Sequence, residues 1–71
     1  MEEKAYKVTL TAARVNAGLT QTDACKKIGI SKATLGSYES GKTSPTIPTL
    51  KTICRVYKVP MDSILFTHDA N

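Results

Sequence analysis

Glycine and proline residues divide this 71-residue chain into short segments, and no other sequence feature constrains the fold as strongly. The breaks are Gly18, Gly29, Gly41, Pro45, Pro48 and Pro60. The segments between them are long enough only for brief helices, and none has the alternating apolar pattern of a strand. We therefore expect a compact all-α fold of five short helices.

The boundaries of that fold follow from where apolar periodicity begins and ends. Residues 1–8 mix acidic and basic side chains without a periodic apolar face, so we expect a flexible lead-in. The domain should span residues 9–66, and residues 67–71 should form a C-terminal tail.

The first helix should run from Thr9 or Leu10 to Ala17. Leu10, Ala13 and Ala17 share one face at helical spacing, and Gly18 suits a left-handed residue at the end. This face should contribute to the core.

The second helix should begin at a capping box, in which the Thr20 hydroxyl accepts from the Asp23 amide and the Asp23 carboxylate reaches back. Its inner face is formed by Ala24, Cys25 and Ile28. Gly29 should end it.

Only Gly29-Ile30-Ser31 separates this helix from the third helix. Ser31 is a suitable N-cap for the third helix, which should run to about Ser40 and end at Gly41. Two short helices joined so tightly cross steeply, as in a helix-turn-helix unit.

The fourth helix should follow a loop over residues 41–46, with Pro48 in its first turn. Its inner face is predicted to contain Leu50, Ile53, Cys54 and Tyr57. Pro60 separates it from a last short helix, predicted over Met61 to Phe66.

The residue inventory argues against an enzyme or a metal site. Cys25 and Cys54 lie far apart without a C-x-x-C spacing, and His68 stands alone, so we expect no metal and no cofactor. The two thiols are interpreted as small core residues, with a disulfide or a functional thiol as alternatives. No paired carboxylates, phosphate-binding glycine loop or nucleophile with a base is evident.

The charge balance suits a polyanionic partner. Ten Lys and Arg exceed six Asp and Glu, which gives a net charge of +4. The sequence also shows no signal peptide and no apolar run of membrane-spanning length, so we expect a cytoplasmic protein.

Several motifs occur together in a fixed order. They are Arg14, Gly18-Leu19-Thr20-Gln21, Ile28-Gly29-Ile30-Ser31, Tyr38-Glu39-Ser40-Gly41-Lys42, Pro45, Leu50, Ile53, Val59, Asp62 and Leu65. This ordered set resembles the Cro and lambda-repressor-like helix-turn-helix (XRE) family. The resemblance implies a five-helix domain whose third helix enters the major groove of DNA.

The third helix carries the residues predicted to read bases. Helical spacing places Lys32, Ala33, Gly36 and Ser37 on one face that is too poor in apolar bulk to be core. Lys32 suits guanine, Ala33 and the methyl group of Thr34 suit thymine, and Ser37 is a permissive donor or acceptor. The alternative is a merely solvated face. The glycine at position 36 either allows close approach of the backbone to the duplex or marks an uncontacted position.

A second set of residues is predicted to contact the DNA backbone. Gln21 starts the second helix, where the amides and the positive helix end favour phosphate, and in the resembling family this glutamine anchors the backbone. Thr20, Lys42, Thr43 and Asn16 would flank the same groove. Each of the last three could instead be an ordinary solvated residue.

The resemblance also implies a structural ion pair between Arg14 and Glu39, linking the first and third helices. Neither residue is therefore a candidate for reading bases. Breaking such a pair is costly when it is buried and nearly neutral when it is exposed.

Together these features predict a sequence-specific transcription regulator, of the bacterial or prophage repressor type, that binds a near-palindromic operator as a homodimer. Dimer contacts are expected in the apolar C-terminal region of Met61, Ile64, Leu65 and Phe66, unless these residues simply close the core. The alternative function is an antitoxin or adaptor whose main partner is a protein. The operator, the regulated genes and any inducer are not predicted.

Overall fold

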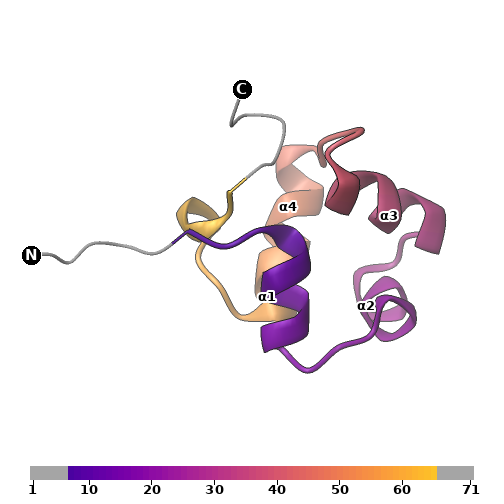
Figure 1. Ribbon diagram of the computed structural model, residues 1–71, viewed down its shortest axis with the longest axis horizontal. Helices are drawn as coiled ribbons and strands as arrows, with labels where there is room; N and C mark the ends of the chain where they lie inside the picture. The colour runs from indigo at the N-terminus through magenta and orange to yellow at the C-terminus, as the bar shows by residue number, and fades with distance from the viewer. Residues whose placement is uncertain (1–6, 66–71) are drawn as a thin grey trace, which may run out of the picture.

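The computed structural model describes residues 7–65, which form four α-helices and one short 3-10 helix. They are α1 (Leu10–Asn16), α2 (Gln21–Ile28), α3 (Lys32–Ser40), α4 (Ile47–Tyr57) and the 3-10 helix η1 (Met61–Ser63). The helices α2 and α3 lie at one end of the molecule, and η1 lies at the other (Figure 1). The prediction of an all-helical fold is confirmed for the described residues.

Hydroxyl side chains start all four α-helices. In each helix the side-chain oxygen of the N-cap accepts a hydrogen bond from the amide three residues further on; the caps are Thr9, Thr20, Ser31 and Thr46. The helices α2 and α3 end at Gly29 and Gly41. The φ angles of these residues are 90° and 81°, in the left-handed region that glycine adopts more readily than other residues. The predicted bounds of these two helices are therefore confirmed.

Apolar residues from all four α-helices meet in one core. The buried residues are Leu10, Ala13, Ala24, Cys25, Leu35, Leu50, Ile53, Cys54, Tyr57 and Ile64. The predicted inner face of α4 is confirmed in full. In α1 the prediction is wrong for Ala17, which is exposed because the helix ends at Asn16 and the chain then turns through Gly18.

The predicted fifth α-helix is not found in the described residues. The chain makes one 3-10 turn over Met61–Ser63, and Ile64 is extended and forms a parallel bridge with Val8. The Val8 amide donates to the Ser63 carbonyl at 2.8 Å, and the Leu65 amide donates to the Val8 carbonyl at 2.8 Å. A helix this short is marginal, because few hydrogen bonds offset its nucleation cost, so pairing with the segment before α1 prevails.

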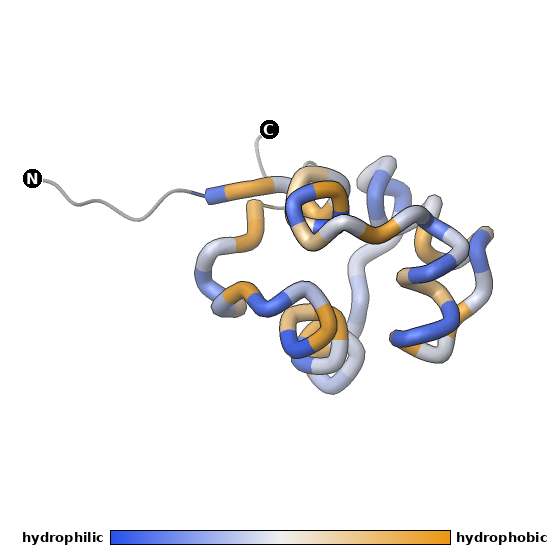
Figure 2. The backbone as a smooth tube through the Cα atoms, turned by 90° about the horizontal axis from the view of Figure 1, so that it is seen from below, coloured by the Kyte–Doolittle hydropathy of each residue, from blue (hydrophilic) through white to orange (hydrophobic). Residues whose placement is uncertain are grey.

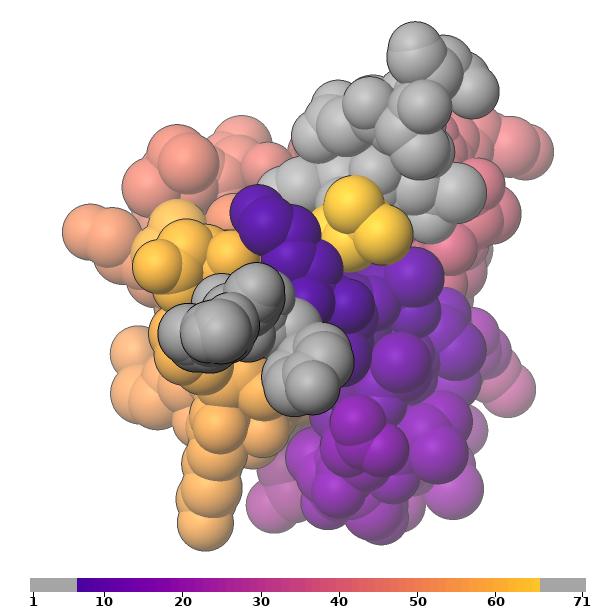
Figure 3. Space-filling view, turned by 60° about the vertical axis from the view of Figure 1, so that its left-hand side comes forward, coloured from indigo at the N-terminus to yellow at the C-terminus, as the bar shows by residue number. Residues whose placement is uncertain are grey.

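This pairing brings together two segments from opposite ends of the chain. Figures 2 and 3 show the segment before α1 beside the segment after η1, and both contain hydrophobic positions. Val8, which the sequence analysis assigned to the lead-in, packs against the core here. Residues 1–6 and 66–71, including Phe66, His68 and the predicted tail, lie outside the described residues.

Both cysteines are buried and unbridged, as the core interpretation predicted. Burial raises the pKa of the Cys54 thiol. Across residues 7–65, no cluster of three or more His, Cys, Asp or Glu side chains is arranged to hold a metal ion. None of the helices in this part of the chain is long and apolar enough to cross a membrane.

Candidate nucleic-acid interface

The turn between α2 and α3 fixes how the two helices cross. The amides of Gly29 and Ile30 both donate to the Cys25 carbonyl, at 2.8 and 3.1 Å, so the chain reverses immediately after α2. In Figure 1, α2 is seen almost end-on while α3 runs across the view, which shows a steep crossing. This is the arrangement predicted for a helix-turn-helix unit.

The helix α3 has one side in the core and one side turned outward. Leu35 is fully buried, whereas Lys32 and Ala33 are exposed and Gly36 and Ser37 are partly exposed. The structure therefore brings these predicted reading residues together on the outward side of the helix.

Thr34 has an additional local role. Its amide donates to the Ser31 side-chain oxygen at 3.0 Å, and the Ser31 hydroxyl donates to the Thr34 side-chain oxygen at 2.8 Å. The cap therefore holds the Thr34 side chain at the start of α3. Its methyl group is the part that the cap does not use.

Gly36 has no neighbour that requires a glycine. A Cβ atom built at this position meets nothing within 4 Å, and its φ is not in the left-handed region. Glycine inside a helix costs about 1 kcal/mol relative to alanine. Packing within the described residues gives no compensation for that cost.

The loop after α3 folds back on the end of the helix. The amides of Lys42 and Thr43 donate to the Ser37 carbonyl, at 2.9 and 3.3 Å, and Gly41 supplies the left-handed turn. These bonds hold the backbone of both loop residues beside the last turn of α3. Both side chains are exposed there.

A partly buried polar network joins α1, α2 and α3. Arg14 Nε lies 2.7 Å from Glu39 Oε2, and the two side chains are only 12% and 7% exposed. Arg14 Nη2 also donates to Glu39 Oε1 at 3.4 Å, and Nη1 donates to the Leu19 carbonyl at 2.9 Å. Gln21 Nε2 donates to Glu39 Oε1 at 3.0 Å. Glu39 thus holds a residue from each of the other two helices.

The pKa values in this network are consistent with a charged pair. Desolvation would raise the pKa of Glu39, but hydrogen bonds from Arg14 and Gln21 outweigh it, and the pKa is lowered. The hydrogen bond to Glu39 raises the pKa of Arg14. Both side chains are therefore ionised at neutral pH.

Thr20 and Asn16 differ in their surroundings. The Thr20 hydroxyl caps α2 by accepting from the Asp23 amide at 3.0 Å, which places Thr20 beside Gln21 at the start of the helix. Asn16 lies at the far end of α1, in the lining of a cavity to which α3 contributes no residue.

The contact between Gln21 and Glu39 is the part of this site that sequence reasoning missed. The two residues are 18 positions apart on different helices, and neither belongs to a local pattern that pairs them. The resemblance linked Glu39 only to Arg14. No signal in a single sequence would have added Gln21.

Comparison with known proteins agrees with this geometry. Residues 10–64 match a protein family described as helix-turn-helix. The chain is also 31% identical over 58 residues to the cryptic phage CTXphi transcriptional repressor RstR of Vibrio cholerae, an alignment that covers 82% of this chain and 52% of that protein. The chain thus spans about half the length of this relative. With most of its length matched and the two crossing helices in place, the chain belongs to the XRE-type helix-turn-helix family.

Proposed function

We propose that this chain is a sequence-specific repressor of the prophage type, which inserts the outward side of α3 into the major groove of double-stranded DNA. The observation that carries the proposal is the composition of that side. It presents one lysine, small residues and a hydroxyl on a helix whose other side is buried. Side chains of this kind allow a helix to approach base edges closely.

Base reading is assigned to Lys32, Ala33, Thr34, Gly36 and Ser37. The Lys32 ammonium suits the two acceptors of guanine, and the methyl groups of Ala33 and Thr34 suit the methyl group of thymine. Ser37 lies more than one turn after Lys32, so the two side chains would reach different base pairs.

Contacts with phosphates are assigned to residues beside this helix. Thr20 and Gln21 occupy the start of α2, where the helix end favours an anion, and the hydrogen bond to Glu39 orients the Gln21 amide. Lys42 and Thr43 flank the end of α3. Asn16 belongs to this set only if the duplex extends past the end of α1. Such contacts set register and leave sequence preference to α3.

A homodimer on a near-palindromic operator completes the proposal. Of the apolar residues considered for its contact, Ile64 is buried and Met61 packs against the core, whereas Leu65 is 39% exposed. We therefore assign the contact to the surface around Leu65. Two α3 helices related by a two-fold axis would read half-sites about one helical turn apart.

Selection from a random pool of duplexes, followed by sequencing, tests this function. We expect an enriched motif with two related half-sites, and an affinity for it that falls steeply between low and moderate salt because phosphate contacts release counterions. Binding with no enriched motif would remove the sequence-specific part of the proposal. An affinity that does not change with salt would remove DNA binding itself.

A further inference from the structure

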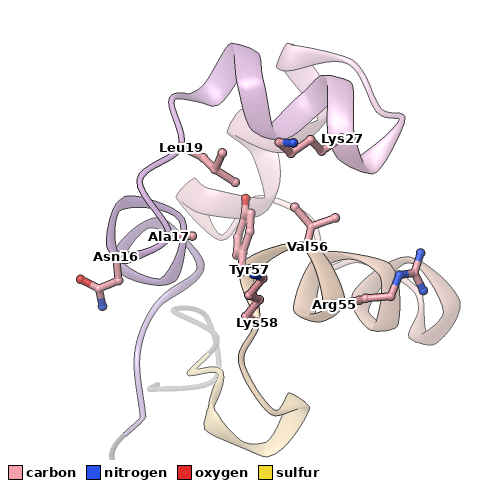
Figure 4. Close-up of a pocket in the computed structure, with 8 residues that line it drawn as sticks. All are labelled: Asn16, Ala17, Leu19, Lys27, Arg55, Val56, Tyr57 and Lys58. Carbon is pink, nitrogen blue, oxygen red and sulfur yellow. The ribbon is translucent and has the colours of Figure 1, made fainter.

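A cavity of about 670 Å³ lies between the C-terminal ends of α1, α2 and α4. Figure 4 shows Leu19, Val56 and the ring of Tyr57 around its centre, with Lys27 on the α2 side and Lys58 at the end of α4. A volume of several hundred Å³ with an apolar wall and a few polar groups is typical of small-molecule sites. The cavity is separate from the outward side of α3.

The charged residues that the structure describes around this cavity all have the same sign. Of residues 7–65, Lys27, Arg55 and Lys58 line it, and no acidic side chain does. Among the described residues, none of the three forms an ion pair. Cations near helix C-termini complement the helix dipole, and Lys27 and Arg55 already do so from within the last turns of α2 and α4.

Lys58 needs a separate explanation. It caps α4 with a φ of 61°, and it is the one non-glycine residue with positive φ in the described part of the chain. After α1, α2 and α3 the left-handed position is occupied by Gly18, Gly29 and Gly41. A lysine there costs stability that glycine would not, and unfavourable backbone conformations that persist are concentrated at functional sites. What lysine adds over glycine is an ammonium group at the cavity.

The wall of the cavity also contains an unsatisfied donor. The Tyr57 hydroxyl is buried and has no hydrogen-bond partner among the described residues, and Figure 4 shows it directed toward Leu19. Burial is the main cause that raises the pKa of Tyr57 to about 12, so the group remains an O–H donor at neutral pH.

From the cavity, the three cations that have no ion-pair partner within residues 7–65, and the left-handed Lys58, we infer a binding site for a small organic anion with an apolar body. The apolar part lies against Leu19, Val56 and the Tyr57 ring, and the acidic group lies between Lys27 and Lys58. The site shares only Asn16 with the residues assigned to DNA contacts, and none of its residues lies on α3, so its occupation does not depend on DNA binding.

The test uses 8-anilinonaphthalene-1-sulfonate, an aromatic body with one sulfonate, and its uncharged analogue N-phenyl-1-naphthylamine. Fluorescence titration gives affinities, and amide chemical shifts of the folded chain locate the site. We expect shift changes concentrated on the residues that line the cavity, and clearly weaker binding of the uncharged analogue. Equal affinities, or shift changes scattered elsewhere, would overturn the inference.

Three variants sharpen the test. Lys58→Gly removes the ammonium group and relieves the left-handed strain, so the fold should remain stable. The affinity for the sulfonate should fall about threefold to fivefold, which is the size expected for the loss of one charge contact that is partly screened by solvent. Lys27→Gln should act similarly. Lys51→Gln, at an exposed position of α4 outside the cavity, should change nothing. The inference fails if the first two variants bind as the parent does, or if a DNA duplex displaces the sulfonate and shifts the same amides.

Discussion

Removal of Glu39 should cost this small domain a large part of its stability. Glu39→Ala deletes the acceptor of two hydrogen bonds from Arg14, at 2.7 and 3.4 Å, and of one from Gln21 at 3.0 Å. Arg14 cannot neutralise by losing its proton. Its side chain, only 12% exposed, would retain the Leu19 carbonyl as its hydrogen-bond partner.

The burial of both partners determines the expected magnitude. Removing one partner of a buried pair costs about 3 to 5 kcal/mol, whereas an exposed pair contributes about 1 kcal/mol or less. Because Arg14 keeps one hydrogen bond and some contact with water, we expect about 3 kcal/mol for Glu39→Ala. Small domains have only about 5 to 15 kcal/mol in total.

Urea unfolding followed by far-ultraviolet circular dichroism measures this change. Asp62→Ala is the control at an exposed acidic residue, and it should change the free energy of unfolding by less than about 0.5 kcal/mol. The double variant Arg14→Met/Glu39→Leu should recover much of the loss, because it leaves no uncompensated charge. A loss below about 1 kcal/mol for Glu39→Ala at an unchanged denaturant slope would refute the argument from burial.

Three further predictions concern the same helix. The pKa of Glu39 is lowered in the folded state, so the ionised carboxylate stabilises the fold. Its contribution to the free energy of unfolding should be complete above the ordinary pKa of 4.5 and should be lost as the pH falls through the folded-state pKa. Glu39→Ala should therefore flatten that part of the plot of unfolding free energy against pH. Gly36→Ala should raise stability by about 1 kcal/mol in thermal unfolding, since its methyl group meets nothing, and should weaken DNA binding if α3 closely approaches the bases. Lys32→Ala and Ser37→Ala should each relax preference at one or two base pairs by about 1 to 3 kcal/mol in selection experiments, whereas Lys42→Ala should weaken all sequences alike.

Each of these predictions has an outcome that contradicts it. Parallel pH profiles for the parent and Glu39→Ala would show that this carboxylate is not the titrating group. Unchanged DNA affinity in a stabilised Gly36→Ala variant would assign that position to an uncontacted side of α3. An unaltered base preference in both Lys32→Ala and Ser37→Ala would refute the assignment of the reading side, even if DNA binding persisted.

Local sequence signals predicted α2 and α3 well because the forces that end these helices are local. The hydroxyls of Thr20 and Ser31 bond to amides three residues away, and Gly29 and Gly41 adopt a conformation that other residues avoid. The start and end of each helix are therefore encoded within a few positions. The turn between the helices, and hence their steep crossing, follows from the same signals.

The features that sequence reasoning missed depend on contacts between distant segments. The pairing of Val8 with Ile64 joins residues at opposite ends of the domain and replaces a helix that apolar spacing had favoured. The bond from Gln21 to Glu39 likewise depends on how α2 and α3 pack together. Periodicity describes which face of a segment is apolar. It carries no information about which distant backbone group will accept a hydrogen bond from an amide that could otherwise bond within a helix.

The pairing of Val8 with Ile64 also determines where anything attached to this domain would emerge. Since the two backbone segments are hydrogen-bonded neighbours, the chain enters and leaves the domain at one place, far from α2 and α3 (Figure 1). A surface tether, a dye or a fused protein added before Lys7 or after Leu65 would start from that same end. Attached before Lys7 or after Leu65, the domain should present α3 to solution in the same way.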